Sequence, residues 1–459
     1  MATAVVDDRG PARSGGSMSV EAPPKPFNPV PPSAAPKKPA FIPPAPRSFY
    51  EAGVDSGIVE SLILKYLLGV GSATGAAICA ELCLPGPPII ELLASLKQQQ
   101  IVVHVGAALM SDFNYALTDS GRDRARRFLL ETMYVGAAPV PVEAYNASVR
   151  AQSIATMHPN EEHLREAFSD LLISPELYSI LGPAINSGRG MFLYGYPGNG
   201  KTSIAERITR CFGDEIWIPK CVVVDGLIIK LYDPQNHEAV PFKKNSIIRT
   251  ESFDERWIKI KRPTIVVGGE LTMDSLEVQY NATSKVCEAP MQMKSNCGTL
   301  VIDDFGRQRM KPIELLNRWI VPLEKRFDYL ALPNGKKIQI PFDQLIIFST
   351  NLEPKDLCDD AFLRRIPYKI NVPNPTEAEF RKLFEIVAPL MGFTIGRQEQ
   401  EALDYLIENH YILKKRPFRC CQPRDLLLQV KNHCLYSEGK LQLTKELFDY
   451  ACSVYFTIM

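Results

Sequence analysis

The sequence has no excess of charge of either sign, because its 52 lysines and arginines balance its 52 aspartates and glutamates. A protein that holds nucleic acid or anionic lipid over much of its surface carries a basic excess. The composition therefore excludes a global basic field and leaves only local patches. The 459 residues suffice for roughly two to four domains, and 46% of them are hydrophobic, which is enough to bury more than one core.

Three other signals are missing. The 11 cysteines form no CxxC pair and no Cys/His cluster at zinc spacing, so they are expected to be buried, reduced thiols, as in a cytoplasmic protein. The N-terminus lacks the basic region and apolar core of a secretory signal. No apolar run reaches ~18 residues, because Glu60, Lys65 and Glu81 interrupt the best candidate. We expect a cytoplasmic protein without a membrane span.

Residues 1–48 are rich in proline, alanine and serine and have no periodic apolar pattern. Such a segment cannot bury enough surface to offset chain entropy, so a disordered tail is predicted. It is interpreted as a tether, with docking to a partner as a polyproline helix as the alternative. Residues 136–160, which contain Pro139 and Pro141, are predicted to be a linker.

Residues 51–135 are predicted to form a small α+β domain. Three helical patterns are followed by two short extended segments, and the sequence from Thr118 to Gly121 caps a basic fourth helix. This order resembles a winged-helix domain, which suggests DNA. The charges disagree, since residues 51–135 hold nine acidic and six basic side chains, and the third helix offers only Lys97. Protein docking is favoured, and nucleic-acid binding stays open.

A glycine-rich loop follows the short apolar run 191–194 and precedes a helical pattern that carries Ile204, Ile208 and Phe212. Strand, loop and helix are the context of a phosphate loop (Walker A), whose backbone N–H groups surround the phosphates of a nucleotide at a helix N-terminus. Lys201 is predicted to bind the β- and γ-phosphates and Thr202 to bind Mg²⁺. The loop comprises Gly195, Tyr196, Pro197, Gly198, Asn199, Gly200, Lys201 and Thr202, and Ser203 follows it.

Two further apolar runs end in polar side chains. Residues 298–302 lead to Asp303 and Asp304, the pattern of Walker B, and residues 345–350 lead to Asn351. Ligands of an open α/β sheet bind at the carboxyl ends of its strands. Asp303 is therefore predicted to hold the water shell of the metal ion, Asp304 to polarise the attacking water, and Asn351 to orient that water. Helix caps or simple strand ends are the structural alternatives.

Four features follow one another along the chain in an order that resembles the AAA+ ATPases over about residues 160–459. They are the phosphate loop, the strand that ends at Asp303, the strand that ends at Asn351 and a later arginine. The resemblance implies a P-loop NTPase α/β domain with a parallel sheet over 161–373 and a helical lid over 374–459. It places the arginine finger, which completes a neighbouring subunit's site, at Arg364 or Arg365. It also places a γ-phosphate contact at Arg424 and the start of the adenine pocket at Ile173. Most members have glutamate where this chain has Asp304, so slow hydrolysis is an alternative.

Two regions contain more residues than a minimal AAA+ α/β domain needs. Residues 213–299 are long for one strand and one helix, and extra β structure is predicted at 226–233 and 257–280. Asn334-Gly335, between two β-prone runs, predicts a hairpin. The hairpin lies where the MoxR-like branch of the family has its pre-sensor-1 hairpin. Lys336 and Lys337 at its tip are then candidates to touch a substrate, and a purely structural hairpin is the alternative.

The resulting hypothesis is an ATP- and Mg²⁺-dependent AAA+ ATPase that assembles as a homo-oligomeric ring, a hexamer, and remodels an unknown protein partner. A nucleotide-gated adaptor with slow hydrolysis is the second hypothesis. A DNA-acting ATPase that uses the winged helix is the third.

Overall fold

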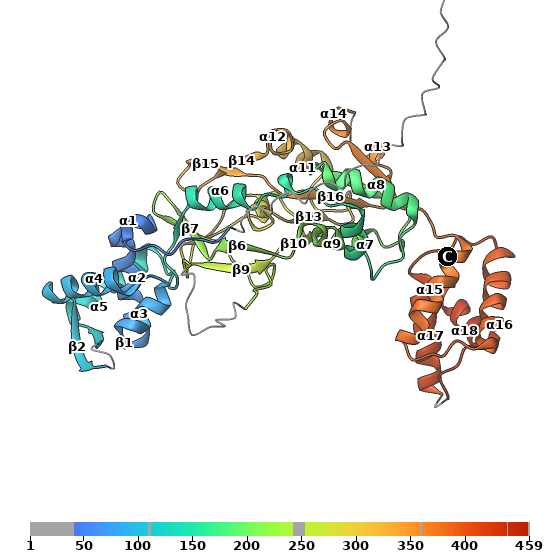
Figure 1. The fold of residues 1–459 in the computed structure, drawn as a ribbon, viewed down its shortest axis with the longest axis horizontal. Coiled ribbons are helices and arrows are strands. Elements are labelled where there is room, and N and C mark those ends of the chain that lie inside the picture. Colours follow the sequence, from blue (N-terminus) through green and yellow to red (C-terminus); the bar gives the residue numbers. More distant parts are fainter. Residues whose placement is uncertain (1–40, 109–111, 242–252, 359, 438, 458–459) are drawn as a thin grey trace, which may run out of the picture. The chain divides into compact units, whose positions relative to one another are not determined.

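The computed structural model describes residues 41–108, 112–241, 253–358, 360–437 and 439–457 (Figure 1). The predicted nucleotide-binding domain contains a five-stranded sheet of order β10-β13-β16-β5-β17, in which all neighbours are parallel. The strands are β10 (Thr264–Val267), β13 (Thr299–Ile302), β16 (Leu345–Thr350), β5 (Met191–Tyr194) and β17 (Tyr368–Asn371). The α/β class with a parallel sheet is confirmed.

Both faces of this sheet are buried, because alternate side chains of a strand enter opposite cores. In β5, Leu193 packs into one core and Phe192 into the other. The first core contains side chains of α7 (Glu161–Ala167), α8 (Pro175–Asn186) and α9 (Lys201–Ile208), which η3 (Thr209–Phe212) extends. The second contains side chains of α11 (Pro312–Arg318), α12 (Ile320–Lys325), α13 (Pro354–Leu357) and α14 (Asp360–Leu363).

The N-terminal α+β domain has a three-stranded antiparallel sheet of order β1-β3-β2. Its core also includes Cys221, Ile228 and Val286, which come from the long segment before β13. Thr118 Oγ1 accepts the N–H of Gly121 at 3.0 Å, which is the predicted helix cap. The sequence did not indicate β1 between the first two long helices. The elements are α1 (Phe49–Ala52), α2 (Ser56–Val70), β1 (Ser72–Thr74), α3 (Gly75–Leu82), α4 (Gly86–Gln98), β2 (Val102–Ala107), β3 (Phe113–Leu117) and α5 (Asp119–Glu131).

Most of the predicted proline-rich tail, residues 1–40, lies outside the described residues. Its last part is placed against the protein: the N–H of Asp254 donates to the carbonyl of Pro43 at 3.0 Å, and the Phe41 ring packs 5.7 Å from that of Trp257. The prediction that the tail continues to residue 48 is therefore wrong for residues 41–48, since an aromatic ring and a backbone carbonyl find partners there.

Residues 136–160 are not an unstructured linker. They contain β4 (Val140–Pro141), α6 (Val142–Ala151) and η2 (Ile154–Thr156), and β4 pairs in parallel with β7. One face of α6 is buried through Val142, Tyr145 and Val149. This spacing of three and four residues is the pattern of an amphipathic helix, which the neighbouring prolines and alanines obscured.

The long segment before β13 holds most of a second five-stranded sheet, of order β11-β12-β8-β7-β4, and an antiparallel pair of β6 with β9. The predicted extra β structure is present, with one correction: β10 within 257–280 is the edge strand of the main sheet. The elements are β6 (Glu215–Pro219), β7 (Cys221–Val224), β8 (Leu227–Lys230), β9 (Trp257–Lys261), η4 (Asp274–Leu276), β11 (Gln279–Asn281), β12 (Val286–Glu288) and α10 (Met291–Lys294).

The hairpin predicted from Asn334-Gly335 is formed by β14 (Phe327–Ala331) and β15 (Lys337–Pro341), with Gly335 at φ 80° in the turn. At its tip the ammonium of Lys336 pairs with Asp225 at 3.0 Å. One of the two candidate lysines is therefore held by a carboxylate of the same chain.

The C-terminal region forms four helices around a separate core (Figure 1). They are α15 (Glu377–Leu390), α16 (Arg397–Leu406) with its π-helical extension (Ile407–Ile412), α17 (Gln422–Tyr436) and α18 (Lys445–Tyr455). Within the described ranges no single helix is long and apolar enough to cross a membrane, and only the bent pair α3 and α4 passes by length and composition.

Arg256, which forms a buried ion pair with Asp254, connects the segment before β9 to the N-terminal domain. The Arg256 guanidinium lies 2.7 Å from the Asp254 carboxylate, and each side chain is only 4% exposed. Nη1 of Arg256 also donates to the carbonyls of Ala52 (2.8 Å) and Pro139 (3.0 Å). One guanidinium thus satisfies backbone carbonyls from two segments that precede it by more than 100 residues.

We predict that Asp254→Ala destabilises the protein by about 3–5 kcal/mol, because a buried guanidinium loses its counter-charge. Urea unfolding followed by tryptophan fluorescence reports on this region, since Trp217 and Trp257 share the adjacent cluster. The double variant Asp254→Ala/Arg256→Met should recover part of the loss, because no unpaired charge stays buried. A loss below about 1 kcal/mol in the single variant would contradict this account.

Candidate functional site

The phosphate loop leaves the carboxyl end of β5 through three glycines with positive φ: Gly195 (138°), Gly198 (85°) and Gly200 (78°). Side chains rarely allow these values. At Gly195 a Cβ would also lie 2.5 Å from the carbonyl oxygen of Val372, which follows β17. Glycine is required here both by the backbone conformation and by the close approach of the neighbouring strand.

Lys201 begins α9 and is buried, with only 7% of its surface exposed. Its ammonium donates to the carbonyls of Gly195 and Tyr196, both at 3.0 Å, and to Oδ1 of Asn351 at 2.7 Å. These three acceptors account for all three N–H donors of an ammonium. Burial lowers the pKa of Lys201 from its usual value, and the nearby Asp303 and Asp304 act against that shift.

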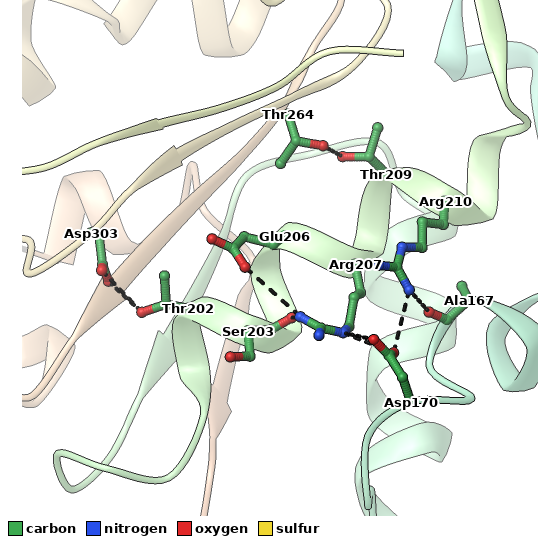
Figure 2. Close-up of polar contacts among 10 residues, drawn as sticks. All are labelled: Ala167, Asp170, Thr202, Ser203, Glu206, Arg207, Thr209, Arg210, Thr264 and Asp303. Carbon is green, nitrogen blue, oxygen red and sulfur yellow. Dashed lines mark hydrogen bonds and ion pairs between the residues drawn. The ribbon is translucent and has the colours of Figure 1, made fainter. Parts of the chain in front are cut away.

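Thr202 Oγ1 lies 3.0 Å from both carboxylate oxygens of Asp303 (Figure 2). The hydroxyl comes from the first turn of α9, and the carboxylate directly follows β13. Mg²⁺ prefers hard oxygen ligands and is usually held by one or two protein oxygens together with phosphates and water. This hydroxyl and carboxylate therefore fit the ion that the sequence predicts.

Asp304 and Asn351 are brought together from neighbouring strands. Nδ2 of Asn351 donates to Oδ1 of Asp304 at 3.1 Å, while Oδ1 of Asn351 accepts from Lys201. Asp304 is exposed and has φ 49°, so its side chain stands beside the site rather than in the core. One amide thus connects the predicted phosphate-binding lysine with the predicted water-polarising carboxylate.

The helix that carries Lys201 and Thr202 is anchored at its other end by contacts that the sequence did not reveal. Nε of Arg207 donates to both carboxylate oxygens of Asp170, at 2.8 and 2.9 Å, and Arg210 Nη1 adds a bond at 3.3 Å (Figure 2). The bond from Arg207 lowers the pKa of Asp170. Thr209 is also bonded to Thr264 of β10, with 2.7 Å between the hydroxyls.

The two candidate finger arginines have different surroundings. Nε of Arg365 donates to Glu324 at 2.7 Å, so this guanidinium is held within its own chain. Arg364 is exposed. Its guanidinium has no hydrogen-bond or ion-pair partner among the residues that the structure describes.

The remaining predicted site residues differ in whether they contact the phosphate loop and its helix α9. Ser203 follows Thr202 in α9 and accepts from Arg207 through its carbonyl. Ile173 packs against the core cluster that includes α9. Arg424 is exposed at the start of α17 and pairs with Asp425 at 3.1 Å, so the structure does not bring it to the loop. Another arginine of the C-terminal region, Arg419, does reach it, through a bond to the Pro197 carbonyl at 2.8 Å.

Comparisons with known proteins give one family match: residues 376–454, within the helical region, match "Domain of unknown function (DUF8689)". The search of curated proteins gave no match.

Among solved structures, NtrX from Brucella abortus in complex with ADP is 14% identical at a TM-score of 0.37, covering 62% of this chain and 56% of that chain. The FIGL-1 AAA domain is 14% identical at 0.32, covering 66% and 83%. A point mutant of RuvB from Thermotoga maritima is 13% identical at 0.34, covering 66% and 72%. The match thus spans little more than half of the NtrX chain. These TM-scores are too low to assign a function to this chain.

We predict that Thr202→Val weakens the Mg²⁺ dependence of nucleotide binding, because Asp303 loses the hydroxyl beside it. The difference in ATP affinity between Mg²⁺ and EDTA should be smaller for this variant than for the natural protein, as measured by calorimetric titration. Thr202→Ser keeps the hydroxyl and is the matched control. If the Val variant retained the full Mg²⁺ effect, Thr202 would not be a ligand of the ion.

Proposed function

We propose that this chain binds ATP with Mg²⁺ and hydrolyses it, as a member of the AAA+ ATPases. One observation carries the proposal: Lys201, Thr202, Asp303, Asp304 and Asn351 meet at the carboxyl ends of three adjacent parallel strands. Neither a helix cap nor an ordinary strand end requires all five together. The glycine conformations of the phosphate loop support the same assignment.

Each residue has a role that follows from its position. The ammonium of Lys201 exchanges its neutral acceptors for the β- and γ-phosphates, which are stronger partners because they are charged. Thr202 and Asp303 would hold Mg²⁺, which would supply positive charge to neutralise the phosphates. Asp304 accepts a proton from the water that attacks the γ-phosphorus, and ADP leaves as the bond to its terminal oxygen breaks. Asn351 orients that water.

The Asp304–Asn351 bond supports gating of this step by the nucleotide. While Asn351 holds Asp304, the carboxylate shares its Oδ1 with an amide instead of with water. A γ-phosphate bound to Lys201 replaces Oδ1 of Asn351 as an acceptor of the ammonium. Aspartate is also one methylene shorter than glutamate, so its reach to the water is poorer. A nucleotide-gated adaptor with slow hydrolysis is the alternative that this observation favours.

For the wider role, we propose a homo-oligomeric ring, a hexamer, that acts on a protein partner through the winged-helix-like domain. Three arginines of α5 already pair with carboxylates of the same domain, which leaves little free basic charge for DNA. These pairs are Arg122–Asp119, Arg124–Glu60 and Arg126–Asp123. Lys336 at the hairpin tip is likewise paired. These contacts weigh against the DNA-acting alternative.

We predict that Lys201→Ala weakens ATP binding by about 10- to 100-fold, because hydrogen bonds from a charged donor to phosphate are lost. Asp304→Asn should bind ATP within about twofold of the natural protein and release no phosphate above background. Calorimetry and a phosphate-release assay separate the two effects. Lys230→Ala, which changes an exposed lysine on β8, is the control for loss of charge.

Three outcomes decide between the hypotheses. Unchanged ATP binding by Lys201→Ala would rule out the site. Tight binding with turnover at the spontaneous rate in the natural protein would favour the adaptor. Strong stimulation of turnover by DNA at low salt would support the hypothesis of a DNA-acting ATPase.

We further predict that Arg364→Ala lowers turnover by about 10³-fold while ATP affinity stays unchanged, as expected for a finger that acts only in the transition state. Arg365→Ala should have a smaller effect, because Glu324 already holds that guanidinium. Steady-state kinetics at saturating ATP test this. Equal turnover of Arg364→Ala and the natural protein would exclude Arg364 as the finger.

A further inference from the structure

The segment that leads into α17 contacts the phosphate loop directly, although more than 200 residues of sequence separate them. Nη1 of Arg419 donates to the carbonyl of Pro197 at 2.8 Å. The backbone N–H of Cys421 donates to the carbonyl of Gly198 at 2.8 Å. The Cys421 side chain packs so closely on the loop that a Cβ on Gly198 would lie 2.5 Å from its Sγ. Two consecutive carbonyls of the loop are therefore bound by the lid.

The next loop residue is fixed from two sides. Asn199 is 3% exposed, and its Nδ2 donates to the carbonyl of Pro373 (3.2 Å) and to Oδ1 of Asn374 (2.8 Å). Its own Oδ1 accepts the N–H of Cys420 at 3.5 Å. Residues 197–199 are thus held by the lid segment and by the connection that leads to it.

These bonds have a consequence for anion binding. A loop that binds phosphate directs its N–H groups toward the anion, and its carbonyls then need other donors. The lid supplies donors to the carbonyls of Pro197 and Gly198, so these carbonyls do not need to turn toward the phosphates. Bonds from a charged donor are stronger than neutral ones, which makes Arg419 the principal member of this contact.

Arg419 is also distinguished from the other candidate in the lid. Its guanidinium carbon lies 5.4 Å from the centre of the Tyr196 ring, a cation–π contact with a second loop residue. The residue is half-buried, whereas Arg424 is exposed and paired with Asp425. Arg419 therefore contacts the loop through both a hydrogen bond and a ring.

We propose that Arg419 is a positioning residue, which holds the phosphate loop in its anion-binding conformation from the lid and so makes nucleotide affinity depend on where the lid lies. This inference rests on the proposed function for its nucleotide. The position of the lid and the conformation of the phosphate loop then depend on each other. When the lid moves away, the loop loses the donors that bind its carbonyls. When phosphates hold the loop in place, the lid segment has fixed carbonyls to bind.

The first test is calorimetric titration of the full chain with ATP and Mg²⁺. Arg419→Ala should bind about tenfold more weakly, from the loss of one charge-assisted hydrogen bond. Arg419→Lys keeps the charge and a donor and should recover most of the affinity. Arg397→Ala, in which the changed side chain is 95% exposed on α16, should bind as the natural protein does. Affinity of Arg419→Ala within about twofold of the natural protein would overturn the proposal.

The second test needs no nucleotide. Hydrogen–deuterium exchange of the backbone amides in residues 195–201 should be about tenfold faster in Arg419→Ala than in the natural protein, because the loop opens more readily. Weaker ATP binding without faster exchange would mean that Arg419 acts by charge alone, which also overturns the positioning role. If the natural protein bound no ATP, the proposed function would fail, and the exchange experiment would still decide whether Arg419 holds the loop.

Discussion

The bond from the Thr202 hydroxyl to the Asp303 carboxylate is possible only because the main sheet is parallel. Parallel strands end at one edge, so the residues that follow β5, β16 and β13 meet there. β16 lies between the other two, which places Asn351 between Lys201 and Asp304. If any one of these strands ran in the opposite direction, its polar residues would lie at the far edge and the constellation would not form.

The same arrangement gives the site two alternative sets of partners. In the structure, Lys201 uses its donors on two loop carbonyls and on Asn351, and Asn351 in turn holds Asp304. A triphosphate offers charged oxygens, which compete well against these neutral acceptors. Binding of the proposed nucleotide would therefore change the partners of Asn351 and Asp304 without any movement of the sheet. The C-terminal region adds a second connection, since Arg419 and Cys421 donate to the carbonyls of Pro197 and Gly198 in the loop.

Features that depend on neighbours in sequence were predictable. The strands before the phosphate loop, before Asp303 and before Asn351 are short apolar runs that end in polar residues, and the hairpin at Gly335 follows from its turn chemistry. Features that depend on distant partners were not. Whether β10 joins the main sheet is decided by pairing with β13, and one face of α6 is buried only because other segments cover it. The bonds Arg207–Asp170 and Arg419–Pro197 span 37 and 222 residues.

The two arginines of the C-terminal region, Arg419 and Arg424, illustrate the same limit. A resemblance assigns a role by position in the chain, and it selected Arg424. The direction of a side chain is set by packing, and Asp425 holds Arg424 at the surface while Arg419 faces the loop.

The most direct test of this account is a crystal structure of the protein with Mg²⁺ and a non-hydrolysable ATP analogue. The account predicts Mg²⁺ about 2.0–2.1 Å from Thr202 Oγ1, with Asp303 in its coordination shell. The γ-phosphate should then bind the ammonium of Lys201 in place of Asn351. A nucleotide bound elsewhere, or a Lys201 that keeps its bond to Asn351 in the presence of the analogue, would contradict it.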